Sequence, residues 1–387
     1  MAQAVLRSER PASAPDAAAL LRSASEEGRT VRFRGGGTKL GWGRLAPEPD
    51  LAVSTGGLER LVEHNVGDLT AVAEAGVALA RAQEAFAAEG QMLALDPPAI
   101  DGSTIGGVIA TGDSGPLRHR FGSPRDLIIG IKVALPDGTI AKAGGKVIKN
   151  VAGYDLAKLF SGAFGTLGLI TEVALRLHPR PAAMATALLR GADPGALAAA
   201  AAALSHAPLE QLALDVSWAG GQGAVLSRFG GATAREQAEA ALREGRDADG
   251  LTREVVDDDE QLWREQCARQ RSQGGMVVRV SGLQSRLADI LRAAEGHGAT
   301  MAGRAGSGLC WLALDERESH EALAAVEDLR RELKPLRCVV LDAPEDVRAA
   351  LDPWGPHDDR ALALMRRVKQ QFDPQGVCNP GIFVGGM

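Results

Sequence analysis

About the first 180 residues alternate short apolar runs with glycine clusters. In TVRFR, Val31 and Phe33 alternate with arginines, and GLITEVALRLHP places its apolar side chains at alternate positions over 173–177, which is the period of a half-buried strand. DLTAVAEAG has a strand-like composition as well. In DLIIGIKVALPDGTIAKAG, the Pro-Asp-Gly turn at 136–138 separates two apolar runs and predicts a hairpin.

Helical periodicity appears at two places in the first part of the chain and at one place near the C-terminus. AAALLRSASEEG predicts a helix with Asp16 as its N-cap, ended by Gly28. ALARAQEAFAAEG predicts a second helix, and DDRALALMRRVKQQF a final one that stops before Pro374. The expected inward faces are Leu79, Ala82 and Phe86 in the second helix, and Ala361, Met365, Val368 and Phe372 in the last.

From about Met184 onward, alanine-rich helical runs alternate with short strand-like runs. ATALLRG, GALAAAAAALSHA and LEQLALDVSW follow a β-α-β order, AVLSRFG, TAREQAEAALREG and TREVVD repeat it, and residues 276–341 have a similar order. This order is typical of the split βαβ, ferredoxin-like arrangement. We therefore expect an α+β protein with one domain over 1–180, a second α+β domain over 181–345, and a C-terminal segment over 346–387 that returns to the first domain.

Composition narrows the class of protein. The 387 residues are 45% hydrophobic and 24% charged, which is the balance of a soluble globular chain of two or three domains. With 43 Lys and Arg against 49 Asp and Glu, the formal net charge is −6, which argues against nucleic-acid binding. The N-terminal stretch lacks a secretory signal, and the longest apolar run, 196–204, is too short to span a bilayer. We expect a cytoplasmic, soluble protein.

The cysteines are few and far apart. They form no CxxC pair, so they predict neither a disulfide framework nor a zinc or iron–sulfur site. The four positions are Cys267, Cys310, Cys338 and Cys378.

Three glycine-rich runs carry the candidate chemistry: RGGGTKLGWG at 34–43, STIGGVIATGDSG at 103–115 and SGAFGTLG at 161–168. Successive glycines can turn backbone N–H groups toward an anion and let a phosphate approach closely. Each run taken alone is also compatible with an ordinary tight turn. Three of them within 170 residues, with Arg34 and Lys39 beside the first, favour a pyrophosphate site.

Two common nucleotide-binding motifs are absent from these runs. GGKV lacks the upstream glycine and the following Ser or Thr of a Walker A loop. GAFGTLG does not have the GxGxxG spacing of a strand-to-helix dinucleotide turn. A conventional NAD or ATP fold is therefore disfavoured.

The motifs in their order resemble a known family. RGGGT, then DPP…STIGGVIATGDSG…RFGSPRDLIIGIKVALPDG, then NVAGYDLAKLFSGAFGTLGLITEVALRL, and finally FDPQGVCNPG, resemble the FAD-linked oxidases of the vanillyl-alcohol-oxidase type. Within that family, KNVAGYDLAKLFSGAFGTLGLITE is most similar to the FAD-binding subunit of bacterial glycolate oxidase. The resemblance covers about 15–180 and 358–383 and is weak between them. It implies a two-subdomain PCMH-type FAD-binding domain over 1–180 with a ferredoxin-like cap.

The resemblance also implies which residues hold the cofactor. The first run would lie against the FAD pyrophosphate, the second on its other side and along the ribityl chain, and the third near the adenine or ribose. Asn379, Pro380 and Gly381 resemble the family's C-terminal return toward the flavin domain. The implied cofactor-binding residues are Arg34, Gly35, Gly36, Gly37, Thr38, Lys39, Thr104, Ile105, Gly106, Gly107, Thr111, Asp113, Ser114, Gly115, Gly165, Thr166, Gly168 and Ile170.

The chain departs from the family pattern at two places. Members with covalent flavin often carry a histidine where this chain has Thr38, so we expect non-covalent FAD. Members that oxidise 2-hydroxy acids usually carry a histidine cluster in the second half. Here the later histidines stand alone, without ligand spacing, so no metal is expected; they are His206, His297, His320 and His357.

No catalytic residue is identified by the sequence. Arg264, Arg269 and Arg271 are compatible with a carboxylate clamp, and equally with a solvated helix face. Tyr154 and Asp155 are candidates for a place near the flavin, but Asp155 is also a candidate N-cap for the AKLF helix. The catalytic base stays unassigned.

The function implied by the resemblance is that of an FAD-binding subunit of a glycolate oxidase (glycolate dehydrogenase) complex that oxidises glycolate to glyoxylate. Its expected partners are a second flavoprotein subunit and an iron–sulfur subunit, through which it would lie at the inner face of a membrane. Two alternatives remain open. One is a stand-alone FAD-dependent oxidase of another 2-hydroxy acid or an alcohol. The other is a flavin-bearing relay or structural subunit without a substrate site of its own.

Overall fold

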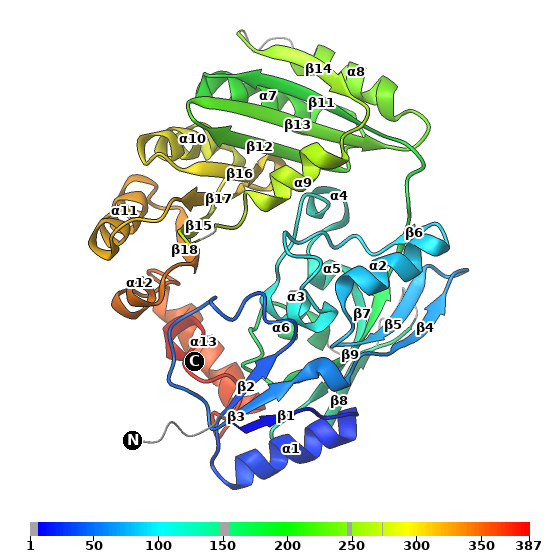
Figure 1. Cartoon of the computed structure of the whole chain (residues 1–387), viewed down its shortest axis with the longest axis vertical. Coiled ribbons are helices and arrows are strands. Elements are labelled where there is room, and N and C mark those ends of the chain that lie inside the picture. Colours follow the sequence, from blue (N-terminus) through cyan, green and yellow to red (C-terminus); the bar gives the residue numbers. More distant parts are fainter. Residues whose placement is uncertain (1–6, 147–154, 246–249, 273) are drawn as a thin grey trace. The chain divides into compact units, whose positions relative to one another are not determined.

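The structure is a computed structural model of the whole chain and describes residues 7–146, 155–245, 250–272 and 274–387. The chain forms two compact units of mixed helix and sheet, as the α+β prediction requires (Figure 1). Unit 1 comprises Met1–Ser114, Gly122–Arg180 and Pro356–Met387, and unit 2 comprises Gly115–Phe121 and Pro181–Gly355. The short segment Gly115–Phe121, which we expected within the first domain, thus belongs to unit 2.

Unit 1 contains a three-stranded parallel sheet in the order β1-β3-β2, a five-stranded antiparallel sheet in the order β4-β5-β9-β7-β8, and a two-stranded pair of β10 and β6. Its strands are β1 (Arg7–Glu9), β2 (Val31–Arg34), β3 (Leu51–Ser54), β4 (Leu61–Asn65), β5 (Thr70–Glu74), β6 (Gln91–Met92), β7 (Ile128–Ala134), β8 (Ile140–Gly144), β9 (Leu169–Arg176) and β10 (His178–Pro179). Its helices are α1 (Ala14–Glu26), α2 (Leu79–Ala88), α3 (Ile105–Thr111), α5 (Pro124–Leu127), α6 (Leu156–Phe160) and α13 (Asp359–Phe372).

The predicted strands and hairpin of unit 1 are confirmed. The hairpin joins β7 and β8, with the Gly138 N–H donating to the Leu135 carbonyl at 3.0 Å to close the turn. Gly138 has a φ of +85°, a value that favours glycine. Strand β9 lies in the middle of the five-stranded sheet and buries Val173 and Leu175 completely.

The first helix begins earlier than we expected. Its N-cap is Ser13, not Asp16: the Ser13 hydroxyl accepts from the Asp16 N–H at 3.2 Å, and Pro15 lies in the first turn. A proline at this position already has the helical φ and lacks an N–H that would otherwise be unsatisfied. Asp16 is therefore an acidic residue of the first turn, and the helix ends at Glu26, before Gly28.

The C-terminal helix α13 turns inward nearly the face that was predicted. Met365, Val368 and Phe372 are half-buried, and the Phe372 ring meets that of Phe160 at 5.4 Å in an edge-to-face contact. The prediction is wrong at the first turn, where Leu362 is buried and Ala361 is exposed.

Unit 2 is built on one eight-stranded sheet in the order β14-β11-β13-β12-β16-β17-β15-β18 (Figure 1). Its strands are β11 (Met184–Gly191), β12 (Ala213–Ala219), β13 (Gln222–Gly230), β14 (Thr252–Val256), β15 (Met276–Ser281), β16 (Thr300–Arg304), β17 (Leu309–Leu314) and β18 (Arg337–Asp342). Its helices are α4 (Arg118–Phe121), α7 (Pro194–His206), α8 (Ala234–Glu244), α9 (Glu260–Ala268), α10 (Leu287–Gly296), α11 (Ser319–Glu332) and α12 (Glu345–Ala350).

The eight strands divide into two halves of the same topology. The first half runs β11-α7-β12-β13-α8-β14, and the second runs β15-α10-β16-β17-α11-β18. Each half is a split βαβ unit, and they join edge to edge through antiparallel pairing of β12 with β16, the second strand of each half. Alanines and leucines of α7, α8, α10 and α11 form one continuous core on one face of the sheet. Trp263 of α9 packs on the opposite face of the first half.

A buried charged pair lies where the two halves of the sheet join. Asp215 on β12 and Arg304 on β16 are direct cross-strand partners, and their side chains are 0% and 1% exposed. The Arg304 Nη1 donates to Asp215 Oδ2 at 2.5 Å, and Gln266 of α9 donates to the same oxygen at 3.0 Å. The guanidinium also lies 4.9 Å from the Trp311 ring centre. Charge, hydrogen bonds and ring stacking thus meet at one point of the β12–β16 ladder.

Candidate functional site

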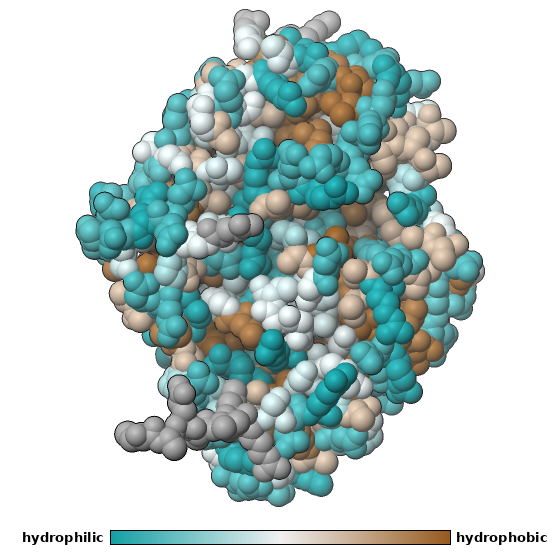
Figure 2. Space-filling view, in the orientation of Figure 1, coloured by the Kyte–Doolittle hydropathy of each residue, from teal (hydrophilic) through white to brown (hydrophobic). Residues whose placement is uncertain are grey.

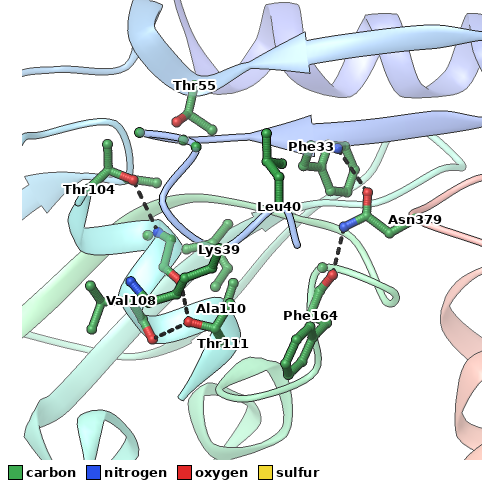
Figure 3. A pocket seen from close by; sticks show the side chains of 18 of the residues that line it. Phe33, Lys39, Leu40, Thr55, Thr104, Val108, Ala110, Thr111, Phe164 and Asn379 are labelled. Carbon is green, nitrogen blue, oxygen red and sulfur yellow. Dashed lines mark hydrogen bonds between the residues drawn. The ribbon is translucent and has the colours of Figure 1, made fainter. Parts of the chain in front are cut away.

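Unit 1 contains a partly open pocket with a cavity volume of about 120 Å³. Three parts of unit 1 that are distant in sequence form its walls (Figure 3). They are the segment after β2, the helix α3 with Ser103 and Thr104 before it, and the loop between α6 and β9. At the surface, residues of near-neutral hydropathy gather over α3 (Figure 2). The C-terminal tail completes the wall with Asn379 and Ile382.

The segment after β2 offers free backbone donors. No hydrogen bond within the described residues uses the N–H groups of Gly35, Gly36 or Gly37, and all three glycines line the pocket. A side chain at Gly36 would collide with the Gly102 carbonyl oxygen, so only glycine lets the two segments lie this close. Consecutive unpaired N–H groups form an anion-binding concavity, which fits a pyrophosphate.

The second glycine-rich run is a helix, not the loop that its glycines predicted. Thr104 caps α3 by accepting from the Gly107 N–H at 3.2 Å. The Ile105 and Gly106 N–H groups donate to the carbonyls of Val77 and Ala75 at 3.0 and 2.8 Å. Because these donors are already paired, this wall contributes shape and close approach, and the free donors come from the first run.

Asn379 connects three parts of the pocket wall. Its Oδ1 accepts from the Phe33 N–H at 2.8 Å, and its Nδ2 donates to the Phe164 carbonyl at 2.6 Å (Figure 3). The backbone on either side pairs with β2: the Val31 N–H donates to the Val377 carbonyl, and the Asn379 N–H donates to the Val31 carbonyl, both at 2.8 Å. The tail therefore lies beside β2 like a further parallel strand.

The motif FDPQGVCNPG has a second anchor in Asp373, which is fully buried. Its carboxylate accepts from the Val377 and Cys378 N–H groups at 2.9 and 2.8 Å. Lys369 pairs with it at 2.6 Å and also donates to the Thr166 and Cys378 carbonyls at 2.7 and 3.0 Å. We expected this motif to return to the flavin domain, and Asp373 and Lys369, which the sequence alone did not single out, hold it there.

The structure brings most of the predicted cofactor residues to this one pocket. Those that line it are Gly35, Gly36, Gly37, Thr38, Lys39, Thr104, Gly106, Gly107, Thr111, Gly165, Gly168 and Ile170. Six others lie outside the lining: Arg34 is exposed, Ile105, Asp113, Ser114 and Thr166 are buried, and Gly115 belongs to unit 2. Lining residues that were not among the predicted cofactor-binding residues are Arg32, Phe33, Leu40, Trp42, Thr55, Ala75, Ser103, Val108, Ala110, Phe164, Leu169, Asn379 and Ile382.

The arginines considered for a carboxylate clamp have other partners or surroundings. Arg264 is exposed and pairs with Glu260 of its own helix at 2.9 Å, and Arg271 pairs with Asp342 at 2.8 Å. Asp155 is the N-cap residue of α6 but makes no side-chain cap bond, and it pairs with Lys158 at 3.0 Å. Tyr154 lies outside the described residues.

The remaining candidate groups are dispersed. Within the described residues, no three His, Cys, Asp or Glu side chains are placed to hold a metal ion. All four cysteines are free thiols, and burial raises the pKa of Cys310 to about 12 and that of Cys338 to about 11. Such thiols are protonated at neutral pH and behave as apolar packing groups.

In the part of the chain that the structure describes, no helix has the length and hydrophobicity to cross a membrane.

Two family models match parts of the chain that contribute residues to the pocket wall. The family model described as "FAD binding domain" matches residues 7–144, and the one described as "FAD linked oxidases, C-terminal domain" matches residues 356–382. The first match spans both glycine-rich walls, and the second includes Asp373 and Asn379. Over these two stretches the chain is thus similar to the FAD-linked oxidases, in agreement with the resemblance of its motifs. Its cofactor is FAD.

Individual relatives agree with this assignment. An uncharacterized FAD-linked oxidoreductase of Mycobacterium tuberculosis is 27% identical over 97% of this chain and 90% of its own length. Glycolate oxidase subunit GlcD of Bacillus subtilis is 35% identical over 46% of this chain and 38% of its own length. Glycolate oxidase subunit GlcE of Escherichia coli is 39% identical over 32% of this chain and 35% of its own length. The matches to these two named subunits thus span little more than a third of each.

The fold itself recurs in a solved structure. An alkyldihydroxyacetonephosphate synthase aligns with a TM-score of 0.71 over 96% of this chain and 75% of its own chain. The sequence identity is 15%, so the likeness concerns the fold alone. The α+β prediction, with a PCMH-type flavin domain and a cap, is confirmed by this likeness and by the family match.

Proposed function

We propose that this chain is the FAD-binding subunit of a glycolate oxidase-type complex and takes part in the oxidation of glycolate to glyoxylate. The observation that carries the proposal is the pocket of unit 1, with the unpaired N–H groups of Gly35–Gly37 on its wall. Named relatives support the substrate class: besides the two glycolate oxidase subunits, they include D-lactate and D-2-hydroxyglutarate dehydrogenases, whose named substrates are all 2-hydroxy acids.

Bound FAD supplies the acceptor for the hydride that leaves C2 of the 2-hydroxy acid. In our proposal the chain's own residues bind and orient the cofactor. The N–H groups of Gly35, Gly36 and Gly37 donate to its pyrophosphate, and α3 and the loop before β9 hold its remaining length. Asn379 keeps the loops around Phe33 and Phe164 at a fixed separation. Unit 1 is then the flavin domain, and unit 2 is the cap.

The proposed partners are a second flavoprotein subunit and an iron–sulfur subunit. Support comes from the relatives named as subunits of glycolate oxidase, one of which is 39% identical to this chain over 124 residues. In this proposal the electrons pass from the flavin to the iron–sulfur partner, and the partners hold the complex at the inner face of the membrane.

The first test is the absorption spectrum of the purified chain before and after denaturation and filtration. A flavin spectrum in the filtrate is expected, because Thr38 has no nucleophilic imidazole to form a covalent link. Flavin retained with the protein would contradict non-covalent binding. No flavin after incubation with excess FAD, with or without the partner subunits, would contradict the proposed role.

The second test is anaerobic titration with glycolate, D-lactate and D-2-hydroxyglutarate, followed by flavin bleaching. Bleaching by glycolate in the co-purified complex, with transfer to the iron–sulfur subunit, is the expected result. Turnover by the isolated chain with production of hydrogen peroxide would instead support a stand-alone oxidase. Bleaching that depends on the second flavoprotein's substrate site would assign this chain the part of a relay.

A further inference from the structure

A lysine ammonium is buried in the wall of the flavin pocket. Lys39 lines the pocket, yet its side chain is only 6% exposed. Its Nζ lies 3.2 Å from each of three oxygens: Thr38 Oγ1, Ser103 Oγ and Asp113 Oδ2. The Asp113 side chain is 3% exposed and does not line the pocket, so the carboxylate stands behind the ammonium as seen from the cavity.

The pair is held by both of the segments that form the phosphate-facing walls. Lys39 lies two residues after the last of the glycines that follow β2. Asp113 follows the end of α3, where Gly112 adopts a φ of +67° and turns the chain. The Asp113 Oδ1 accepts from the Ser114 N–H at 3.0 Å, which fixes the carboxylate from its other side. The Lys39 ammonium also lies 5.9 Å from the Trp42 ring centre. Both charges are therefore fixed in position.

The opposite charges of Lys39 and Asp113 largely offset each other in the pocket. Charges removed from water interact more strongly than exposed ones, and a buried charge without its partner is costly. In the intact pair the Asp113 carboxylate offsets most of the positive field that Lys39 sends into the pocket. Removing the carboxylate leaves a net positive charge at the wall, and removing the ammonium leaves a net negative one.

We propose that the Lys39–Asp113 pair sets the charge of the flavin pocket, and through it the affinity for FAD and the reduction potential of the bound flavin. Lys39 is a positioning residue in this proposal, with Asp113 setting how much of its charge the cofactor experiences. Reduction adds electrons to the flavin, so positive charge at the wall favours the reduced form and negative charge opposes it. The inference rests on the proposed placement of FAD in this pocket.

The test compares substitutions with opposite expected signs. D113N retains a side chain of the same shape and leaves Lys39 uncompensated, so the reduction potential is expected to rise. K39M leaves Asp113 uncompensated, so the potential is expected to fall and the Kd for FAD to increase at least tenfold. K39R keeps the charge and is expected to restore both properties toward the wild type. The double variant K39M/D113N is expected to have a potential between those of the single variants.

A matched control is K132M, which breaks the Lys132–Glu172 pair of the five-stranded sheet at 2.6 Å, away from the pocket lining. The potential is measured by dye equilibration, the Kd by FAD titration and the fold by circular dichroism. Shifts of the same sign for D113N and K39M, or shifts no larger than for K132M, would overturn the proposal. If K39M does not fold, D113N decides alone, because any result other than a raised potential contradicts it.

Failure of the proposed function has a different signature. If the wild type and K132M bind no FAD in this pocket, the cofactor placement fails, and this inference fails with it. If both bind FAD normally while D113N and K39M leave its potential unchanged, the flavin site stands and only the role of the pair is wrong.

Discussion

The two units each bury a charged pair, and the surroundings of the pairs differ. In unit 2, Asp215 and Arg304 lie opposite each other in the β12–β16 ladder, fully enclosed by the sheet, by Gln266 and by Trp311. In unit 1, Lys39 and Asp113 are almost as deeply buried, but the ammonium lies on the wall of a pocket. Burial alone therefore does not decide the role of a charged pair. A pair that faces a cavity can act on a bound group, whereas an enclosed pair acts on the fold.

The architectural role follows from where the pair in unit 2 lies. Two halves of equal topology meet at β12 and β16. A slip by one residue is opposed by burial itself, because it would turn every core side chain of the strand to the other face. A slip by two residues keeps the faces but separates Asp215 from Arg304 and leaves two buried charges without partners. The pair therefore specifies the alignment of the halves, much as a single polar residue fixes the register of a coiled coil.

The largest effect is expected from R304M. It leaves the Asp215 carboxylate buried without its cation, which costs about 3–5 kcal/mol of unfolding free energy. Urea unfolding of the purified chain measures the loss. The double variant R304M/D215N, with no buried charge left, is expected to recover part of it. A loss below about 1 kcal/mol for R304M would show that the pair does not hold the two halves together.

A second substitution, G106D, acts on the pocket of unit 1 and not on the sheet of unit 2. G106D places a side chain and a negative charge beside Ala75, where a Cβ would already approach the Ala75 carbonyl oxygen to 2.8 Å. FAD binding is expected to fall at least a hundredfold, with unfolding of unit 2 unchanged. G41D is the control, since a Cβ at Gly41 meets nothing within 4 Å. Stoichiometric flavin in purified G106D would refute the proposed placement of the cofactor.

A smaller effect is expected from N379A, which removes the links to Phe33 and Phe164. Leaving a half-buried N–H and a carbonyl without partners costs about 2 kcal/mol. Because both partners belong to the pocket wall, the cost should appear chiefly as a Kd for FAD raised about tenfold, measured by titration. R360A, on the exposed side of α13, should change neither quantity. Unaltered FAD affinity in N379A would mean that the tail is not needed to shape the pocket.

The smallest effect concerns His119 in unit 2. Burial lowers the pKa of this imidazole, and Arg120 lowers it further, against a hydrogen bond with Gln211 that raises it. The unfolded chain then binds the proton more readily, so stability is lost as pH falls below about 6.5. H119Q is expected to reduce that loss, because glutamine takes up no proton when the chain unfolds. The check is urea unfolding at pH 7 and pH 5 beside H206Q, which alters an exposed histidine; an identical pH dependence in all three proteins would exclude His119.

Local patterns in the sequence were sufficient for much of the fold. Alternation identified β2 and β9, the Pro-Asp-Gly turn between two apolar runs identified the β7–β8 hairpin, and the helix-strand order identified both split βαβ halves. The pairing of β12 with β16 was beyond reach, because edge-to-edge joining leaves no periodic signal in either strand. In α13 the apolar pattern identified the inward positions Met365, Val368 and Phe372, but not the burial of Leu362 in the first turn.

The site was only partly accessible from sequence for a similar reason. Glycine runs signal close backbone approach, and they led to most of the residues on the walls. The sequence does not show whether the N–H of a glycine is already hydrogen-bonded. In the structure the Gly106 N–H is paired, whereas that of Gly35 is free. Apolar lining residues such as Val108 and Leu169 lie in or directly after the glycine-rich runs, but they give no signal of their own, since any small hydrophobic side chain fills such a position. The signal for Asn379 was present in CNPG, but its bridging role requires the tertiary fold.

The strand-like pairing of Val377–Asn379 with β2 has a consequence for how the protein is made. Residues 181–355 are synthesised between the two parts of unit 1, so the second unit is complete before the last piece of the first has left the ribosome. Until then, β2 has an open edge and the pocket lacks a wall. Binding of FAD is therefore expected only after residues 377–379 have been synthesised, and until then the open edge of β2 is available for wrong strand pairing.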